Sequence, residues 1–163
     1  MKNINSVAKK IFTLPELQHK IAQERILGKK ISFTNGCFDI LHRGHIASLS
    51  QAASEGDFLV VGLNSDSSTK QLKGPGRPIN DEQSRALLLA SLLIVDAVIL
   101  FAEETPLELI KSIMPDVIVK GGDYTVEQIA GAKEVIANGG RVVINPIVEG
   151  FSTTGLIEKI TRL

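Results

Sequence analysis

Short apolar segments alternate with longer amphipathic segments along most of the chain. The apolar segments are rich in β-branched and aromatic residues, as buried strands are, and they lie at Ile31–Thr34, Phe58–Leu63, Ala97–Phe101, Val117–Val119 and Arg141–Ile144. The segments between them have helical spacing, near Ile46–Ser54, Asp81–Leu93, Pro106–Ile113, Val126–Asn138 and Thr154–Arg162. This alternation predicts an α/β fold with a five-stranded parallel sheet and helices on both faces. Such sheets bind ligands at the carboxyl ends of their strands, so the residues that follow each strand are the candidates for a site.

The first 30 residues differ from the rest in charge, with seven basic against two acidic side chains. Thr13 and Glu16 have the spacing of a capping box, Pro15 lies in the first turn, and Gly28 suits the end of a helix. We therefore predict a helical arm over residues 1–30 and a second unit over residues 31–163. The favoured interpretation of the arm is a surface helix packed beside the core, and ligand binding is the alternative.

Composition limits the classes of protein to consider. A chain of 163 residues that is 44% hydrophobic can build one globular domain with a core. Its 18 basic and 18 acidic side chains cancel, so no global positive field exists to hold nucleic acid or an anionic membrane. The single cysteine, Cys37, excludes an internal disulfide and a multi-cysteine zinc site. With no apolar signal core and no apolar run of bilayer length, we expect a soluble cytoplasmic protein.

The segment after the first predicted strand contains two of the three histidines. Gly36 permits a tight turn, and His42 and His45 are spaced to share one face of a helix's first turn. A helix N-terminus offers free N–H groups to a phosphate, and Gly44 leaves room for a ligand to approach. Two imidazoles beside those donors can hydrogen-bond to phosphate oxygens, or neutralise them if protonated. The alternatives are ordinary capping or core histidines, or a metal pair, although zinc would need further ligands.

Cys37 lies in the turn before the two histidines. As a nucleophile it would need a base, and His42 is the available one. The favoured interpretation is a small, half-buried residue, since free cysteine often behaves as a small hydrophobe.

A basic, glycine-rich segment follows the second predicted strand. We expect it to be a loop that carries Lys70, Lys73 and Arg77 and closes over a phosphate-bearing ligand. The alternative is a solvated turn with scattered charges. Arg85, in the next predicted helix, could point back to the same site.

Small and polar residues also follow the last two predicted strands. Gly121 and Gly122 free the backbone for close contact with a base or ribose, and Asp123 could accept from ribose hydroxyls or cap the next helix. The run Ser152-Thr-Thr154 places three hydroxyls at the start of the final helix, more than capping requires. It forms a second candidate anion site.

Together these motifs resemble a known family. The segments Asn35-Gly-Cys-Phe-Asp39, His42-Arg-Gly-His45 and Ser152-Thr-Thr154 are similar to those of the cytidylyltransferase-like branch of the H-x-G-H nucleotidyltransferases. The further motifs are Lys73-Gly-Pro-Gly-Arg-Pro78, Lys120-Gly-Gly-Asp-Tyr124 and Val148-Glu-Gly150. They narrow the resemblance to the adenylyltransferase half of the bifunctional heptose-phosphate kinase/adenylyltransferases of lipopolysaccharide core synthesis. The resemblance begins near Leu17, and without the sugar-kinase half we expect a free-standing version.

The resemblance implies a single Rossmann-like domain and an enzyme with no metal site of its own. It would transfer AMP from ATP, with Mg²⁺, to D-glycero-β-D-manno-heptose 1-phosphate. Apart from the resemblance, the apolar helix around Ala86–Leu93 and the basic arm could supply the contact face of a homo-oligomer. The implied catalytic residues are His42, His45 and Lys73. The implied nucleotide-binding residues are Asn35, Gly36, Cys37, Phe38, Gly44, Gly121, Gly122, Asp123, Ser152, Thr153 and Thr154, and the implied substrate-binding residues are Asp39, Arg77 and Arg85. The alternatives are a CTP-dependent transferase for a polyol phosphate such as glycerol 3-phosphate, and a non-catalytic nucleotide-binding module.

Overall fold

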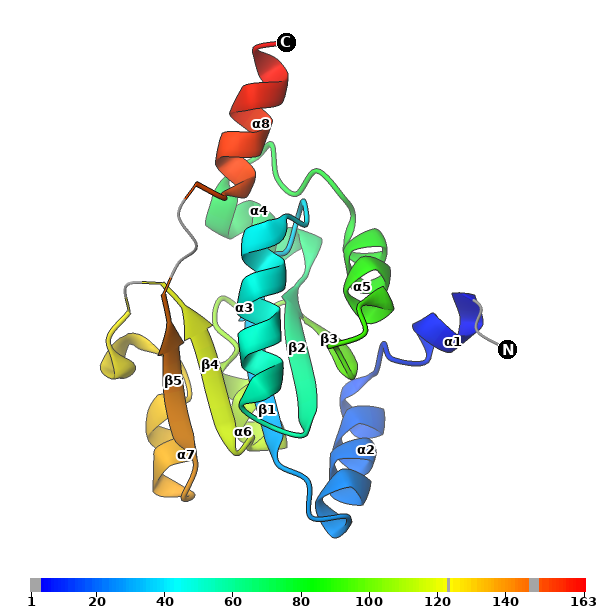
Figure 1. Cartoon of the computed structure of the whole chain (residues 1–163), viewed down its shortest axis with the longest axis vertical. Helices are drawn as coiled ribbons and strands as arrows, with labels where there is room; N and C mark the ends of the chain where they lie inside the picture. The colour runs from blue at the N-terminus through cyan, green and yellow to red at the C-terminus, as the bar shows by residue number, and fades with distance from the viewer. Residues whose placement is uncertain (1–3, 123, 147–149) are drawn as a thin grey trace.

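Five strands pair side by side in one sheet, all of them parallel, in the order β3-β2-β1-β4-β5 (Figure 1). The computed structural model describes residues 4–122, 124–146 and 150–163. The strands are β1 (Ile31–Gly36), β2 (Phe58–Asn64), β3 (Ala97–Phe101), β4 (Val117–Gly121) and β5 (Arg141–Asn145). Each predicted strand lies within an observed one, so the predicted five-stranded parallel sheet is confirmed.

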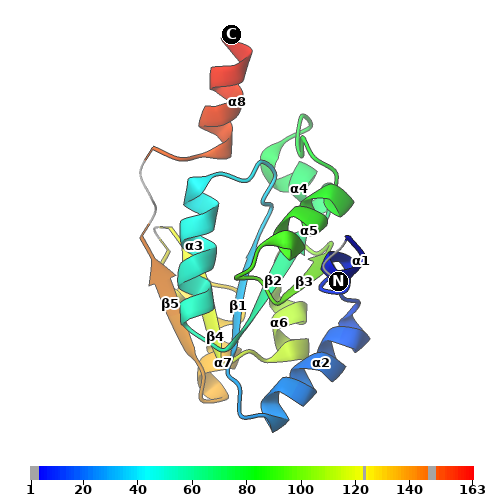
Figure 2. The ribbon, with the colours of Figure 1, turned by 45° about the vertical axis from the view of Figure 1, so that its right-hand side comes forward.

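Helices connect the strands and cover the sheet (Figure 2). Their bounds are α1 (Ile4–Ala8), α2 (Leu14–Ile26), α3 (Arg43–Ser54), α4 (Asp66–Lys73), α5 (Glu82–Ser91), α6 (Leu107–Ile113), the 3₁₀ turn η1 (Val126–Gln128), α7 (Ala132–Ala137) and α8 (Thr153–Thr161). In both views α8 projects beyond the carboxyl end of the sheet. None of the described helices has the length and apolar character needed to cross a membrane.

The two faces of the sheet are buried in separate hydrophobic clusters. Alternate strand residues point to opposite faces, so Val60 joins one cluster while its neighbours Leu59 and Val61 join the other. Helices α2, α6 and α7 pack on the first face, and α3 and α5 pack on the second. The expectation of helices on both faces is therefore confirmed.

Two helix predictions are wrong. The segment predicted as a loop after β2 forms α4, whose first turn is capped by the Ser65 hydroxyl accepting from the Ser68 N–H at 3.2 Å. Lys70 and Lys73 therefore lie on a helix, and the loop begins only at Gly74. The single helix predicted over Val126–Asn138 is interrupted at Gly131, which adopts a left-handed conformation with φ of 80°.

The N-terminal arm packs against the sheet. The predicted capping box is present, because the Glu16 carboxylate accepts from both the N–H and the hydroxyl of Thr13. Leu17 and Ile21 are buried in the first cluster. Ile11 pairs with Val98 on β3, so the arm covers an edge that would otherwise be open to pairing with another chain.

Candidate active site

A cleft of about 810 Å³ opens at the carboxyl ends of the strands. The predicted site residues that line it are Asn35, Gly36, Cys37, Phe38, Asp39, His42, Gly44, His45, Lys73, Arg77, Gly121, Ser152, Thr153 and Thr154. Gly122 and Arg85 are not among the lining residues. Asp123 lies outside the described residues, as do Val148 and Glu149 of the Val148-Glu-Gly150 motif. The cleft thus brings the histidine motif, Lys73 and the hydroxyl run together.

The cleft lies where the order of the strands reverses. The chain runs outward from β1 to β2 and β3, then returns to β4 on the other side of β1. The pairing of β1 with β4 is recorded at Ser32–Val117 and Phe33–Ile118 only, whereas β1 and β2 pair over six positions from Ile31 to Gly36. Crevices of this kind are the usual ligand sites of open α/β sheets.

The two histidines form a stacked pair at the start of α3. His42 is the N-cap residue, and its Nδ1 accepts a hydrogen bond from the Gly44 N–H at 3.1 Å. Because Nδ1 is an acceptor, the neutral ring carries its proton on Nε2, where it is free to donate. The rings of His42 and His45 lie 3.9 Å apart between centroids, at 21° to one another.

Burial keeps both imidazoles neutral. It lowers the pKa of His42, and together with the neighbouring His42 it lowers the pKa of His45 to about 4, against the opposing effect of the Ile40 carbonyl. At neutral pH the free protein therefore presents the pair as hydrogen-bond donors rather than as cations. Positive charge in the cleft must come from other groups.

The start of α8 packs against the start of α3. A Cβ on Gly44 would lie 3.0 Å from the His42 ring and 3.1 Å from Cβ of Phe151, so glycine lets the two segments approach. The Arg43 guanidinium stands over the Phe151 ring at 5.7 Å. The Thr153 hydroxyl donates to the Ile40 carbonyl at 3.5 Å. Two helix N-termini therefore border one cleft, which is a favourable arrangement for a polyanion.

The three hydroxyls of the run have different environments. Ser152 is the N-cap of α8, and its hydroxyl accepts from the Gly155 N–H at 3.0 Å. Thr153 is held by the Ile40 carbonyl. Thr154 is exposed and lines the cleft. Capping therefore accounts for Ser152, and Thr154 is the member most open to a ligand.

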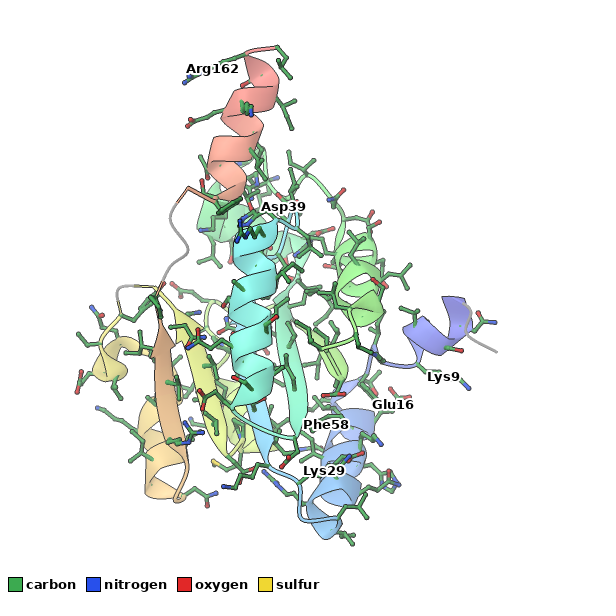
Figure 3. The ribbon with its side chains drawn as sticks, viewed as in Figure 1. Lys9, Glu16, Lys29, Asp39, Phe58 and Arg162 are labelled. Atoms are coloured by element: carbon green, nitrogen blue, oxygen red, sulfur yellow. The ribbon has the colours of Figure 1, made fainter. Side chains whose placement is uncertain are left out.

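Asp39 lies at the N-terminal end of α3, near the start of α8 (Figure 3). Its side chain is fully buried and accepts from Arg77 Nε at 2.6 Å and from the backbone N–H groups of Ile79 and Asn80 at 2.8 and 2.9 Å. These bonds and the Arg77 charge outweigh burial and lower the pKa of the carboxyl group. Asp39 lines the cleft, but its oxygens are already occupied in fixing the segment after α4, so its expected substrate-binding role stays a prediction.

Arg85 also differs from expectation. Its side chain is 0% exposed and donates to the carbonyls of Cys37 at 2.6 Å and Asn64 at 2.9 Å, and to the Asp66 carboxylate at 2.7 Å. A third carbonyl, that of Asn80, accepts from Nε at 3.0 Å. The guanidinium therefore joins the ends of β1 and β2 beneath the cleft, and we assign Arg85 a positioning role instead of a substrate-binding one.

Phe38 shapes the wall beside the histidines. Its backbone is left-handed, with φ of 45°, and its ring centroid lies 5.3 Å from that of His45. A Cβ on Gly36 would lie 3.1 Å from the Phe38 ring. Glycine at position 36 therefore leaves room for this ring. A strained residue beside the histidine pair is typical of sites that hold fixed geometry.

Lys120 is a cleft residue that sequence reasoning did not assign to the site. It follows three buried apolar residues on β4, and its Nζ donates to Asn35 Oδ1 at 3.1 Å and stands 5.6 Å from the Tyr124 ring centroid. Burial and the charge of Lys73 lower its pKa, while Cys37 opposes that shift. The sequence signal that could have assigned Lys120 to the site is its position, as a lysine at the carboxyl end of an otherwise apolar strand.

The described residues contain no group of three or more His, Cys, Asp or Glu side chains placed to hold a metal ion. Cys37 is a free, half-buried thiol in the cleft wall.

Comparison with known proteins places the chain in context. The family model described as cytidylyltransferase-like matches residues 33–159. The bifunctional protein HldE of Koribacter versatilis is 57% identical over 150 residues, which are 92% of this chain and 31% of that protein. The bifunctional protein HldE of Alkalilimnicola ehrlichii is 51% identical over 150 residues, which are also 92% of this chain and 31% of that protein. The chain spans about a third of the length of these curated relatives.

Solved structures show the same fold. The lipopolysaccharide core biosynthesis protein of Thermoplasma volcanium is 34% identical with a TM-score of 0.59, over 74% of this chain and 98% of that one. The pantothenate synthetase of Thermus thermophilus is 20% identical with a TM-score of 0.60, over 90% of this chain and 67% of that one. The second likeness concerns the fold alone.

Proposed function

Because the chain belongs to the cytidylyltransferase-like family, we propose that it is a nucleotidyltransferase that moves AMP from ATP to a sugar 1-phosphate and releases pyrophosphate. The acceptor we propose is D-glycero-β-D-manno-heptose 1-phosphate, and the product ADP-heptose serves lipopolysaccharide core synthesis. The motif resemblance and the similarity to the HldE proteins and the lipopolysaccharide core biosynthesis protein support this choice. An ATP-dependent reaction of this kind belongs in the cytoplasm.

One observation carries the proposal: the stacked histidines, Lys73 and two helix N-termini border the same cleft. A polyphosphate needs several donors converging on it, and a module that only binds nucleotide has no need of two neutral imidazoles at a helix start. His42 and His45 would donate to phosphate oxygens as charge develops on them. Lys73, the last residue of α4, would supply positive charge at the same cleft.

The chemistry asks little of the protein beyond positioning. A phosphate oxygen of the acceptor, already ionised at neutral pH, attacks the α-phosphorus of ATP in line. The bond to the pyrophosphate oxygen breaks, and pyrophosphate leaves with the electron pair. No protein nucleophile is required, so we assign Cys37 no covalent role. Catalysis then consists of orientation and charge stabilisation, which the residues of this cleft can provide.

Mg²⁺ would enter on the phosphates of ATP. It prefers oxygen ligands and keeps much of its water, so phosphate oxygens with few protein ligands can satisfy it. The ion would neutralise charge on the phosphates when bound.

A pyrophosphate-release assay tests the proposal. ATP or CTP is supplied with heptose 1-phosphate, other sugar 1-phosphates, or glycerol 3-phosphate. We expect the highest kcat/KM for ATP with heptose 1-phosphate. A preference for CTP with glycerol 3-phosphate would establish the polyol-phosphate alternative. Nucleotide binding without pyrophosphate release from any pair would establish the non-catalytic one.

A further inference from the structure

Lys120 stands at the crevice between β1 and β4. The recorded pairing of the two strands ends at Phe33–Ile118, and two residues further along each strand the side chains of Asn35 and Lys120 meet at 3.1 Å. This contact spans the point where the order of the strands reverses. Lys120 lines the cleft that also holds the histidine pair and Lys73.

The ammonium group of Lys120 has no anionic side chain bonded to it in the part of the chain that the structure describes. Its hydrogen-bond partner is the neutral Asn35 amide, and the Tyr124 ring covers it at 5.6 Å. The nearby Lys73 adds a second positive charge. Of the carboxylates that line the cleft, Asp39 is bonded to Arg77, and Glu104 is exposed.

A mostly buried cation without a bonded anion costs free energy unless a ligand neutralises it. Its aliphatic stem continues the apolar part of β4, but a methionine would fill that space without the charge. Asn35 fixes the position of the ammonium group while leaving its other two N–H donors for a ligand. The charge is therefore best explained by an anion that enters the cleft.

We propose that Lys120 binds a substrate phosphate at the crevice between β1 and β4, acting with Lys73 as the second cation of the site. This inference rests on the proposed function. The phosphate belongs either to ATP or to the sugar 1-phosphate, and one set of measurements separates the two sources.

The test compares the wild type with Lys120→Met, which keeps the side-chain length and removes the charge. Steady-state pyrophosphate release gives kcat and the KM of each substrate, and titration calorimetry with a non-hydrolysable ATP analogue gives binding without turnover. We expect kcat/KM to fall by about 30-fold or more. A raised KM and Kd for ATP assigns the phosphate to ATP, and a raised acceptor KM with unchanged analogue binding assigns it to the acceptor. Tm should stay the same or rise.

Matched variants make the result specific. Lys133→Met, an exposed lysine on α7 outside the cleft, should leave all constants unchanged. If Lys120→Met does not fold, Lys120→Gln is measured in the same way. Unchanged constants in the folded variant, or a lowered Tm with unchanged constants, would overturn the inference and leave the proposed function standing. If the wild type binds the analogue but does not turn over heptose 1-phosphate, the acceptor assignment fails, and loss of analogue binding in Lys120→Met still supports the inference.

Discussion

His42 and His45 share one small volume, and that arrangement decides how they can act. Stacked rings 3.9 Å apart cannot both be protonated without strong repulsion, and burial already disfavours the charged forms. The pair is therefore suited to donating hydrogen bonds to phosphate oxygens. The net positive charge that a polyphosphate needs then falls to lysines and helix N-termini in the same cleft.

Replacing His45 with alanine should lower kcat by about 100-fold or more, because one donor to the developing charge is lost. The KM of ATP should change much less, since several other groups still hold the phosphates. Steady-state pyrophosphate release measures both. His19→Ala is the matched control, because His19 lies on α2 and contacts Gln23. A wild-type kcat in His45→Ala would remove the residue from the mechanism.

Acid should destabilise the fold partly through His45. Its pKa is about 4 in the folded protein against an ordinary 6.5, so below pH 6.5 the unfolded chain takes up a proton that the folded chain does not. Stability is therefore fully present above pH 6.5 and falls as the pH drops towards 4, by at most about 3 kcal/mol from this group.

Urea unfolding of the wild type and His45→Asn between pH 4.5 and 7.5 measures this effect. The variant should lose less stability on acidification than the wild type. Asp39 and Glu24, whose pKa values are lowered, will make both proteins less stable in acid. Parallel curves for the two proteins would contradict the assignment to His45.

At the level of elements, the hydrophobic periodicity and the polar residues between segments were sufficient to predict the strands but not every helix. Strand runs such as Phe58–Leu63 are apolar and bounded by polar residues, here Asp57 and Asn64, so their prediction needs no tertiary information. Helix α4 was missed because its sequence, Asp66-Ser-Ser-Thr-Lys-Gln-Leu-Lys73, is polar and lacks an apolar stripe. At the break the packing of α6 requires glycine, since a Cβ on Gly131 would lie 2.5 Å from Ile110 Cγ2, and this tertiary contact is not visible in the local sequence.

The candidate site, like the helices, could be predicted only in part. Motif residues at strand ends were expected together because parallel strands deliver them to one edge, and His42, His45 and Lys73 do line one cleft. For Asp39 and Arg85 the sequence could not specify the environment, because a charged residue near a motif looks the same in sequence whether it faces the ligand or is bonded within the protein. Only the observed partners of these two side chains distinguish the cases.

Arg85 joins several elements, so its loss should be a loss of stability. Arg85→Met leaves the carbonyls of Cys37, Asn64 and Asn80 without their donor and should cost about 3 kcal/mol in the free energy of unfolding, measured in urea. Arg162→Met, at the exposed end of α8, should change stability by less than about 0.5 kcal/mol. A raised acceptor KM with unchanged stability would instead restore the substrate-binding role.

On the scale of the whole molecule, the sheet carries two cores, and the arm contributes side chains to both of them. Leu17 and Ile21 pack in the same cluster as Phe33 of the central strand β1. Ile11 adds to the edge of β3, and the Lys10 ammonium donates to the Val95 carbonyl at 2.6 Å. These contacts predict that residues 1–30 and 31–163 unfold together, although the excess of basic side chains in residues 1–30 sets the two segments apart in the sequence.

Leu17→Ala tests that prediction. Leu17 is 0% exposed, and truncating it should destabilise the protein by about 3 kcal/mol through lost burial and a cavity. Ile26→Ala on the same helix is the matched control, because Ile26 is 85% exposed and should matter little. Urea unfolding is followed by helical circular dichroism and by protection of β1 amides from hydrogen exchange. If the arm cooperates with the sheet, both probes shift to the same lower midpoint in Leu17→Ala. A separate early transition with unchanged protection of β1 would mean that the arm is an independent unit and that residues 31–163 hold the cleft without it.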